Sequence, residues 1–149
     1  DRRVAMAKRF KTQNEIDAFL ETPRLAMLLY NGPHPAPTGV PVWFDWDGKR
    51  LRMFAGRTSP KVARLKEDPH ASVLVTNQVR EPEGWVAFDG LITISDFEAE
   101  DWQSLIDRVA PRYWDLSDPG YKQEIEGWRA SPESFVSLEL EQMTIRSGA

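Results

Sequence analysis

The sequence predicts an antiparallel α+β fold in which six strands form a closed or partly closed barrel with short helices at its ends. Three observations support this prediction. Six short segments carry apolar runs or apolar–polar alternation, an Asp-Gly turn joins two of them, and segments with helical apolar spacing lie between and after them. Closing the sheet removes exposed strand edges, which favours a barrel. With 149 residues the chain is expected to be a single domain, 1–149.

The N-terminal part is expected to hold one helix, one strand and one loop. After a patternless basic arm (1–11), Thr12 and Glu15 have the spacing of a capping box, which begins a helix that ends before the first proline. Residues 25–30 form a short apolar run typical of a buried strand. Residues 31–41 contain four prolines and two glycines and are expected to be a loop.

A β-hairpin is expected next. Residues 42–46 and 51–55 flank Asp47 and Gly48, a pair that favours a tight two-residue turn. Alternation along the second strand places two sets of side chains on opposite faces. These sets are Leu51, Met53 and Ala55 on one face, and Arg50, Arg52 and Phe54 on the other.

The middle of the chain is expected to contain a short helix and two strands. Ser59, followed by proline, has the pattern of an N-cap before the first helical position. That helix is expected to end at Asp68. Residues 71–76 and 86–95 are expected strands, the second interrupted at Gly90.

The C-terminal part changes to helical periodicity at Glu98. Its apolar residues fall at i, i+3, i+4 and i+7 and predict one buried stripe, made of Trp102, Leu105, Ile106 and Val109. A turn over 117–120 precedes a second helix over 121–129. The alternating segment 135–140 predicts the last strand, with an extension to residue 145 left open.

Composition disfavours several classes of function. The chain has no cysteine and two histidines, which excludes disulfides and Cys-based zinc sites and leaves no expected metal site. A net charge of -4 disfavours nonspecific nucleic-acid binding. No apolar run approaches the roughly 18 residues of a membrane span. No secretory leader is evident, so a cytoplasmic protein is expected.

Residues 57–61, Arg-Thr-Ser-Pro-Lys, are the segment most suggestive of chemistry. They lie between a predicted strand and a predicted helix, where unpaired N–H groups and a partial positive charge suit a phosphate. Two basic side chains and two hydroxyl groups would add to such a site. From these residues alone, an ordinary capped helix that carries two exposed cations is the more common reading of a Ser-Pro start.

The order of elements around this segment resembles a known family. An aromatic-rich strand, a tight hairpin, a strand ending in Met-Phe-Ala and a helix opened by Ser59-Pro60-Lys61 are followed by Asp68-Pro69-His70-Ala71-Ser72-Val73. This succession, over residues 41–95, resembles the FMN-binding split β-barrel of the pyridoxamine 5'-phosphate oxidase-like superfamily. The resemblance implies a split barrel and a homodimer with the flavin at its interface. It also implies that the Ser-x-Lys segment holds the FMN phosphate.

The resemblance also implies cofactor-binding residues. Ser59 and Lys61 match the family's phosphate-binding serine and lysine, and Arg57 and Thr58 precede them in the same turn. The remaining implied residues contact the flavin ring. The backbone of Val42, Trp43 and Phe44 matches the strand along the ring, and Trp85 falls where the oxidases place a glutamine. Packing in the core or at a dimer interface is an equal reading for both tryptophans.

Two departures indicate a relative of the oxidases rather than an oxidase proper. The oxidases carry two phosphate-binding residues, an arginine and a lysine, where this chain has Gly39 and Phe44. Their C-terminal basic motif, which holds the pyridoxal substrate, has no match near residues 145–147.

Three functions remain open at this point. The first is an FMN-dependent oxidoreductase that moves electrons between the flavin and a small organic substrate, with a nicotinamide as electron donor. The second is a reductase that uses a deazaflavin, whose longer acidic tail would draw on Arg50, Arg52 and Arg57. The third is a flavin-binding or stress-associated protein without turnover. No catalytic residue is assigned.

Overall fold

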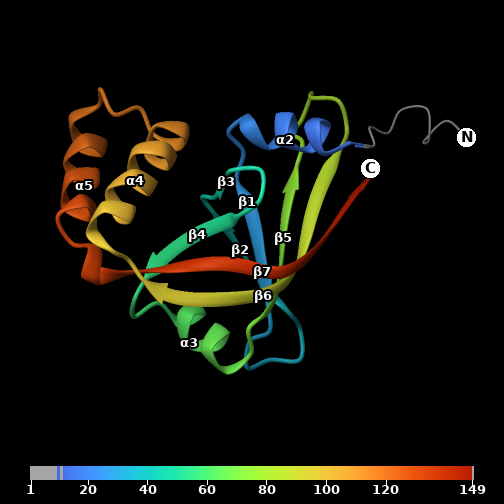
Figure 1. Cartoon of the computed structure of the whole chain (residues 1–149), viewed down its shortest axis with the longest axis horizontal. Helices are drawn as coiled ribbons and strands as arrows, with labels where there is room; N and C mark the ends of the chain where they lie inside the picture. Colours follow the sequence, from blue (N-terminus) through green and yellow to red (C-terminus); the bar gives the residue numbers. More distant parts are fainter. Residues whose placement is uncertain (1–9, 11, 149) are drawn as a thin grey trace, which may run out of the picture.

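The chain forms one curled antiparallel sheet with helices at its ends and along one side (Figure 1). The structure is a computed structural model and describes residue 10 and residues 12–148, so most of the expected basic arm lies outside the described residues. The strands are β1 (Ala26–Tyr30), β2 (Thr38–Val42), β3 (Asp45–Trp46), β4 (Leu51–Gly56), β5 (His70–Thr76), β6 (Trp85–Asp96) and β7 (Phe135–Gly148). The helices are α2 (Gln13–Glu21), α3 (Pro60–Glu67), α4 (Ala99–Tyr113), α5 (Pro119–Arg129) and the short 3-10 helix η1 (Pro132–Ser134).

The strands follow the order β2-β1-β5-β6-β7-β4-β3, and all neighbouring pairs are antiparallel. The expected hairpin is confirmed, because Asp45 pairs with Arg52 and Trp46 with Leu51. Gly48 at its tip has φ +95°, a left-handed conformation that glycine adopts without steric cost. The α+β split barrel that the sequence predicted is therefore the observed architecture.

The barrel interior is apolar and follows the alternation of the strands. The β4 side chains predicted to share one face are all buried, while the intervening Phe54 lies outside the barrel in a second apolar cluster. The large side chains fully buried in this core include Phe44, Phe88, Leu28, Leu51, Met53 and Leu138. Burial of these groups is the main stabilising contribution to the barrel.

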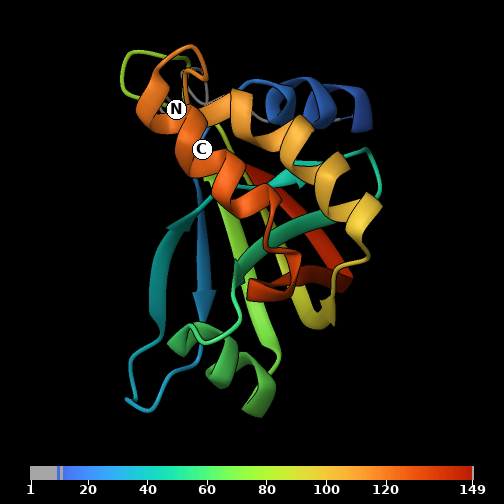
Figure 2. The same cartoon turned by 90° about the vertical axis from the view of Figure 1, so that its left-hand side faces the viewer.

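Helices close the barrel and extend it to one side (Figure 1, Figure 2). Helix α2 covers one end and is capped as expected, since the Thr12 hydroxyl accepts from the Glu15 N–H at 3.2 Å. Helix α3 lies at the opposite end. Helices α4 and α5 pack together beside the barrel over an apolar cluster centred on Trp102, Ile106, Ala110 and Ile125.

One predicted strand is wrong in its bounds, so the sheet has seven strands instead of six. Residues 38–41, expected to be loop, begin β2, whereas Trp43 and Phe44 lie between β2 and β3. β2 pairs only with β1 and is an edge strand, the position in a sheet where a proline such as Pro41 is tolerated. The proline count therefore disguised a real strand.

The C-terminal half departs less from expectation. Helix α5 begins at Pro119, inside the expected turn, because proline is well suited to a first helical turn. The register of β6 against β7 shifts between Asp89 and Leu91, so the predicted interruption at Gly90 is a β-bulge. The extension of the last strand to residue 145, which the sequence left open, is present, and β7 continues to Gly148.

Candidate functional site

Helix α3 begins at the predicted position, with Ser59 as N-cap and Pro60 in its first turn. Main-chain hydrogen bonds hold the preceding turn, from the Arg57 N–H to the Ser134 carbonyl at 2.9 Å and from the Ser59 N–H to the Gly56 carbonyl at 3.0 Å. The Ser59 hydroxyl makes no capping hydrogen bond. Pro60 has no N–H and the Val62 N–H bonds to the Ser59 carbonyl at 3.1 Å, so this helix end retains the Ser59 hydroxyl and the Lys61 N–H for an external anion.

Lys61 lies half-buried in the same turn and lines a groove of about 310 Å³. The other lining residues come from both sides of the split in the barrel and from α5, and they are Leu25, Pro41, Val42, Trp43, Phe54 and Trp128. Lys61 is the one charged residue that lines this groove. Within the described part of the chain its ammonium has no ion pair or hydrogen bond. A half-buried cation without a counterion favours an anionic ligand.

The groove is otherwise aromatic. The Trp43 ring stacks on Tyr113, with centroids 5.0 Å apart and planes within 7°, and lies 5.6 Å from Trp128. Phe54, on the outer face of β4, lies 5.9 Å from Trp128 in an edge-on arrangement. These contacts fix the walls of the groove and give it flat apolar surfaces suited to a planar ring.

Three of the predicted site residues line this groove, namely Val42, Trp43 and Lys61. Phe44 does not, because its side chain is fully buried in the barrel core. Its backbone N–H is directed to the Tyr113 hydroxyl at 3.4 Å. The contact implied for Phe44 can therefore involve only its main chain.

Arg57 and Thr58 lie exposed in the turn before α3. The Arg57 guanidinium already bonds to the Glu133 carbonyl at 2.8 Å and to the Asp96 carboxylate at 2.7 Å. Its implied role as a phosphate ligand stays a prediction and would require these bonds to be exchanged. The Thr58 hydroxyl makes no hydrogen bond within the described residues.

Trp85 lies elsewhere on the molecule. It lines a second cavity of about 300 Å³ on the outer face of the sheet, together with Leu29, Leu74 and Arg146. The Arg146 guanidinium sits 5.7 Å from the Trp85 ring centroid. This cavity and the groove at Lys61 have no lining residue in common. A single chain therefore places Trp85 and Lys61 in separate cavities.

The arginines considered for an acidic cofactor tail are paired within the chain. Arg50 bonds to Glu139 at 2.5 Å, and this hydrogen bond raises the pKa of Arg50. Arg52 is buried on β4 and bonds to Asp101 at 2.8 Å. With Arg57 held by its own carboxylate partner, all three cations already have an anion.

A third cavity, of about 690 Å³, also opens on the outer face of the sheet, beside His70 and Ser72. The His70 ring nitrogen Nδ1 lies 2.8 Å from Asp68, which also accepts from Asn31 at 2.9 Å. The hydrogen bonds from Asn31 and His70 lower the pKa of Asp68 to about 2. His70 is thus the first residue of β5 and is held beside Asp68, the C-cap of α3.

Among residue 10 and residues 12–148, no group of three His, Asp or Glu side chains is placed to hold a metal ion. No helix in that part of the chain is long and apolar enough to span a bilayer.

Sequence reasoning missed Trp128, Phe54 and Tyr113 as parts of this site. Trp128 and Phe54 line the groove, and Tyr113 stacks behind Trp43. The helices α5 and α4 show only amphipathic spacing, and Phe54 lies in an ordinary alternating strand. No local pattern in the sequence marks them, because they reach the groove through long-range contacts.

Comparison with known proteins identifies the family. The profile described as Pyridoxamine 5'-phosphate oxidase matches residues 12–145, and this chain therefore belongs to that family. No curated protein matches the sequence significantly.

Solved structures share the fold at low identity. Rv2991, a conserved hypothetical protein of Mycobacterium tuberculosis, has a TM-score of 0.67 and 21% identity, with coverage of 93% of this chain and 85% of that one. An F420 reductase has a TM-score of 0.64 and 22% identity, with coverage of 87% of this chain and 94% of that one. A FAD-binding protein of Mesorhizobium loti has a TM-score of 0.63 and 16% identity, with coverage of 96% of this chain and 97% of that one. At these identities the likeness concerns the fold alone.

Proposed function

We propose that this protein is an FMN-dependent oxidoreductase that moves electrons between bound flavin and a small organic substrate. The observation that carries the proposal is Lys61, a half-buried cation without a partner among the described residues, at a helix N-terminus that opens into an aromatic groove. Membership of the family supports the choice of cofactor.

The residues at α3 fit a phosphate monoester. Lys61 supplies a full positive charge, and the hydroxyls of Ser59 and Thr58 make no hydrogen bonds with the described residues. The N-terminus of α3 adds the Lys61 N–H and a partial positive charge. We therefore assign the FMN phosphate to Ser59 and Lys61, with Thr58 beside them.

The groove beyond Lys61 fits the ring of the cofactor. The main chain of residues 42–44 would run along it, and the walls of Trp43 and Trp128 would exclude water from one side. When bound, FMN supplies the redox chemistry. The chain's own groups would bind and orient it and control access of the substrate.

The paired arginines favour FMN over a deazaflavin with a long acidic tail. Such a tail would need free cations, and Arg50, Arg52 and Arg57 each contact a carboxylate of the chain. Exchanging the partner of the buried Arg52 would cost part of the gain in binding.

A homodimer would complete the site. The outer face of the sheet exposes part of Met27, Leu29, Leu74 and Trp85, which makes it an apolar surface that a second copy can cover. Because Trp85 and Lys61 line separate cavities, the implied ring contact of Trp85 requires a second copy to present it.

The test is a titration of the purified protein with FMN, followed by absorbance and by flavin fluorescence. We expect saturable binding at one site per chain and bleaching of the bound flavin by a nicotinamide donor. Saturation with deazaflavin but not FMN would contradict the cofactor assignment. Bound FMN that no nicotinamide reduces would favour a flavin-binding protein without turnover.

A further inference from the structure

The wall of the groove at Trp43 has an unusual support. Trp43 and Phe44 lie between β2 and β3, where the strand ladder is interrupted. The Phe44 N–H is directed to the Tyr113 hydroxyl at 3.4 Å, and this hydroxyl donates to the Arg24 carbonyl at 2.8 Å. Arg24 and Phe44 each adjoin a residue that lines the groove, Leu25 and Trp43. One hydroxyl therefore ties both borders of the groove to the end of α4.

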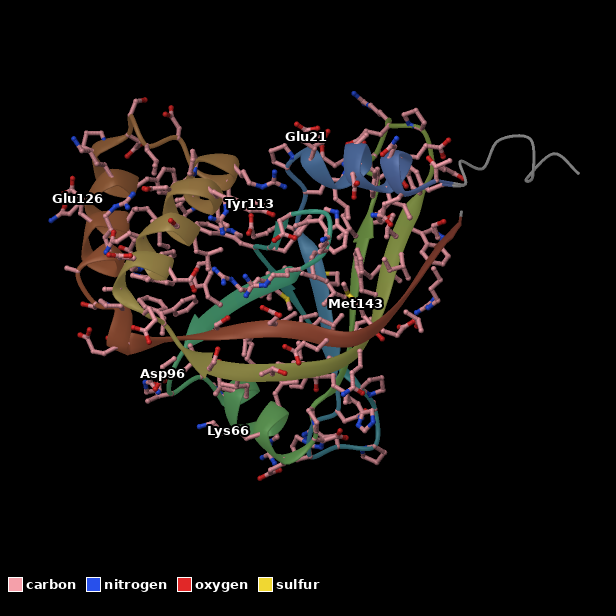
Figure 3. All side chains as sticks on the ribbon, viewed as in Figure 1. Glu21, Lys66, Asp96, Tyr113, Glu126 and Met143 are labelled. Carbon is pink, nitrogen blue, oxygen red and sulfur yellow. The ribbon has the colours of Figure 1, made fainter. Side chains whose placement is uncertain are left out.

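The Tyr113 ring fixes the same wall. It lies parallel to Trp43 at 5.0 Å, whereas Trp114 meets Trp43 edge-on at 4.9 Å. Figure 3 shows Tyr113 where the end of α4 approaches the strands of the barrel. Two aromatic contacts at defined angles leave Trp43 little freedom to rotate.

The hydroxyl, and not only the ring, is needed for this arrangement. Phenylalanine would keep the stacking but would leave the Phe44 N–H and the Arg24 carbonyl without this partner. Burial raises the pKa of Tyr113, so the hydroxyl keeps its proton as a donor throughout the neutral range.

We propose that Tyr113 is a positioning residue that holds Trp43 in the orientation that a bound flavin ring contacts. The proposal rests on the FMN site described above. It extends that site to a residue 69 positions beyond Phe44 in the chain, on an element that does not line the groove.

Tyr113→Phe is the test, with Tyr121→Phe as matched control. Tyr121 belongs to the same aromatic cluster, stacked on Trp114 at 4.6 Å, but its hydroxyl makes no hydrogen bond among the described residues. We expect Tyr113→Phe to weaken FMN binding about three- to tenfold, the usual effect of one lost hydrogen bond. The visible circular dichroism of the flavin should also fall at saturating FMN. Tyr121→Phe should match the wild type in both.

The measurements separate this proposal from the FMN assignment. If the wild type binds no FMN, the cofactor assignment fails, and near-ultraviolet circular dichroism of the free protein still tests whether Tyr113→Phe reorients Trp43. If the wild type binds FMN and Tyr113→Phe keeps its affinity and dichroism, the positioning role is wrong. A merely structural role would lower the unfolding midpoint without changing the dichroism at saturation. If Tyr113→Phe fails to fold, the visible circular dichroism of flavin bound to Trp43→Phe is measured instead. An unchanged signal in that variant would overturn the proposal.

Discussion

Of the two cations beside the turn before α3, Arg57 is paired within the chain and Lys61 has no partner among the described residues. The Arg57 guanidinium is held by a carbonyl and a carboxylate, and it ties the turn before α3 to the segment before β7. Lys61 is half-buried with no partner among the described residues. An unpaired cation in a groove loses hydration without compensation, and a bound phosphate would supply the missing charge-assisted hydrogen bonds. Under the proposed function we therefore expect the phosphate to bind Lys61 first, whereas Arg57 could join only by giving up its present partners.

Lys61→Ala is expected to weaken FMN binding about tenfold or more, because it removes a charge-assisted hydrogen bond to phosphate. Lys66→Ala is the matched control, since Lys66 is exposed in the last turn of the same helix and far from its N-terminus. Flavin fluorescence titration measures both variants. Equal affinities of the two variants for FMN would show that the phosphate does not bind at the start of α3.

Asp68 gives a pH-dependent prediction. Its pKa is about 2 in the folded chain, below the ordinary value of 3.8, because Asn31 and His70 hydrogen-bond to the ionised carboxylate. The stabilisation is therefore complete above about pH 4 and is lost as the pH falls through about 2. In urea unfolding, Asp68→Asn should reduce stability at pH 6 and show a shallower loss between pH 4 and pH 2. An unchanged acid profile would contradict the role of this carboxylate.

How far the site could be predicted differs from residue to residue. Ser59 and Lys61 carry a local pattern, a helix start, that the sequence displays directly. Trp128, Phe54 and Tyr113 reach the groove only through tertiary contacts, and single amphipathic or alternating patterns describe them equally well as packing. Nor does local sequence reveal that Arg50, Arg52 and Arg57 are paired with distant carboxylates.

At the level of elements, the errors in the predicted strand bounds lie in the edge strand β2 and directly after it. β2 contains a glycine and a proline and pairs with one neighbour, so its sequence resembles a loop. The interruption at Trp43 and Phe44 was likewise hidden, because apolar residues continue through it. The central strands and the helices were predictable, since the apolar periodicity there agrees with the packing.

Gly90 illustrates a constraint on one element. A Cβ at this position would collide with the Glu141 carbonyl oxygen and lie 3.1 Å from the Met143 Cα. Gly90→Ala is therefore expected to lower the free energy of unfolding by about 1–3 kcal/mol, the usual cost of overpacking. Gly127→Ala is the opposite case, because a Cβ there meets nothing within 4 Å in an exposed helix. It should raise stability by about 0.5–1 kcal/mol. Urea unfolding of both variants checks the signs, and a neutral Gly90→Ala would refute the constraint at the bulge.

The whole molecule presents its candidate contacts on two surfaces. Lys61 and Trp43 face the groove at the split, whereas Trp85 and Leu29 line the cavity on the outer face of the sheet. Helices cover the ends and one side of the barrel (Figure 1, Figure 2). Self-association through the outer face would cover its apolar side chains and supply Trp85 to the groove of the other copy.

Leu29→Lys tests this association. Leu29 lies half-buried on the outer face and lines both cavities there, so a charge at this position would have to be desolvated in a dimer. We expect the variant to remain folded and to become monomeric by light scattering. Its affinity for FMN should fall about tenfold or more, as for a central interface residue. Val79→Lys, in a loop where the residue is 90% exposed, is the control and should behave as the wild type. A monomeric variant that keeps full affinity for FMN would show that one chain forms the whole site and that Trp85 does not contribute to it.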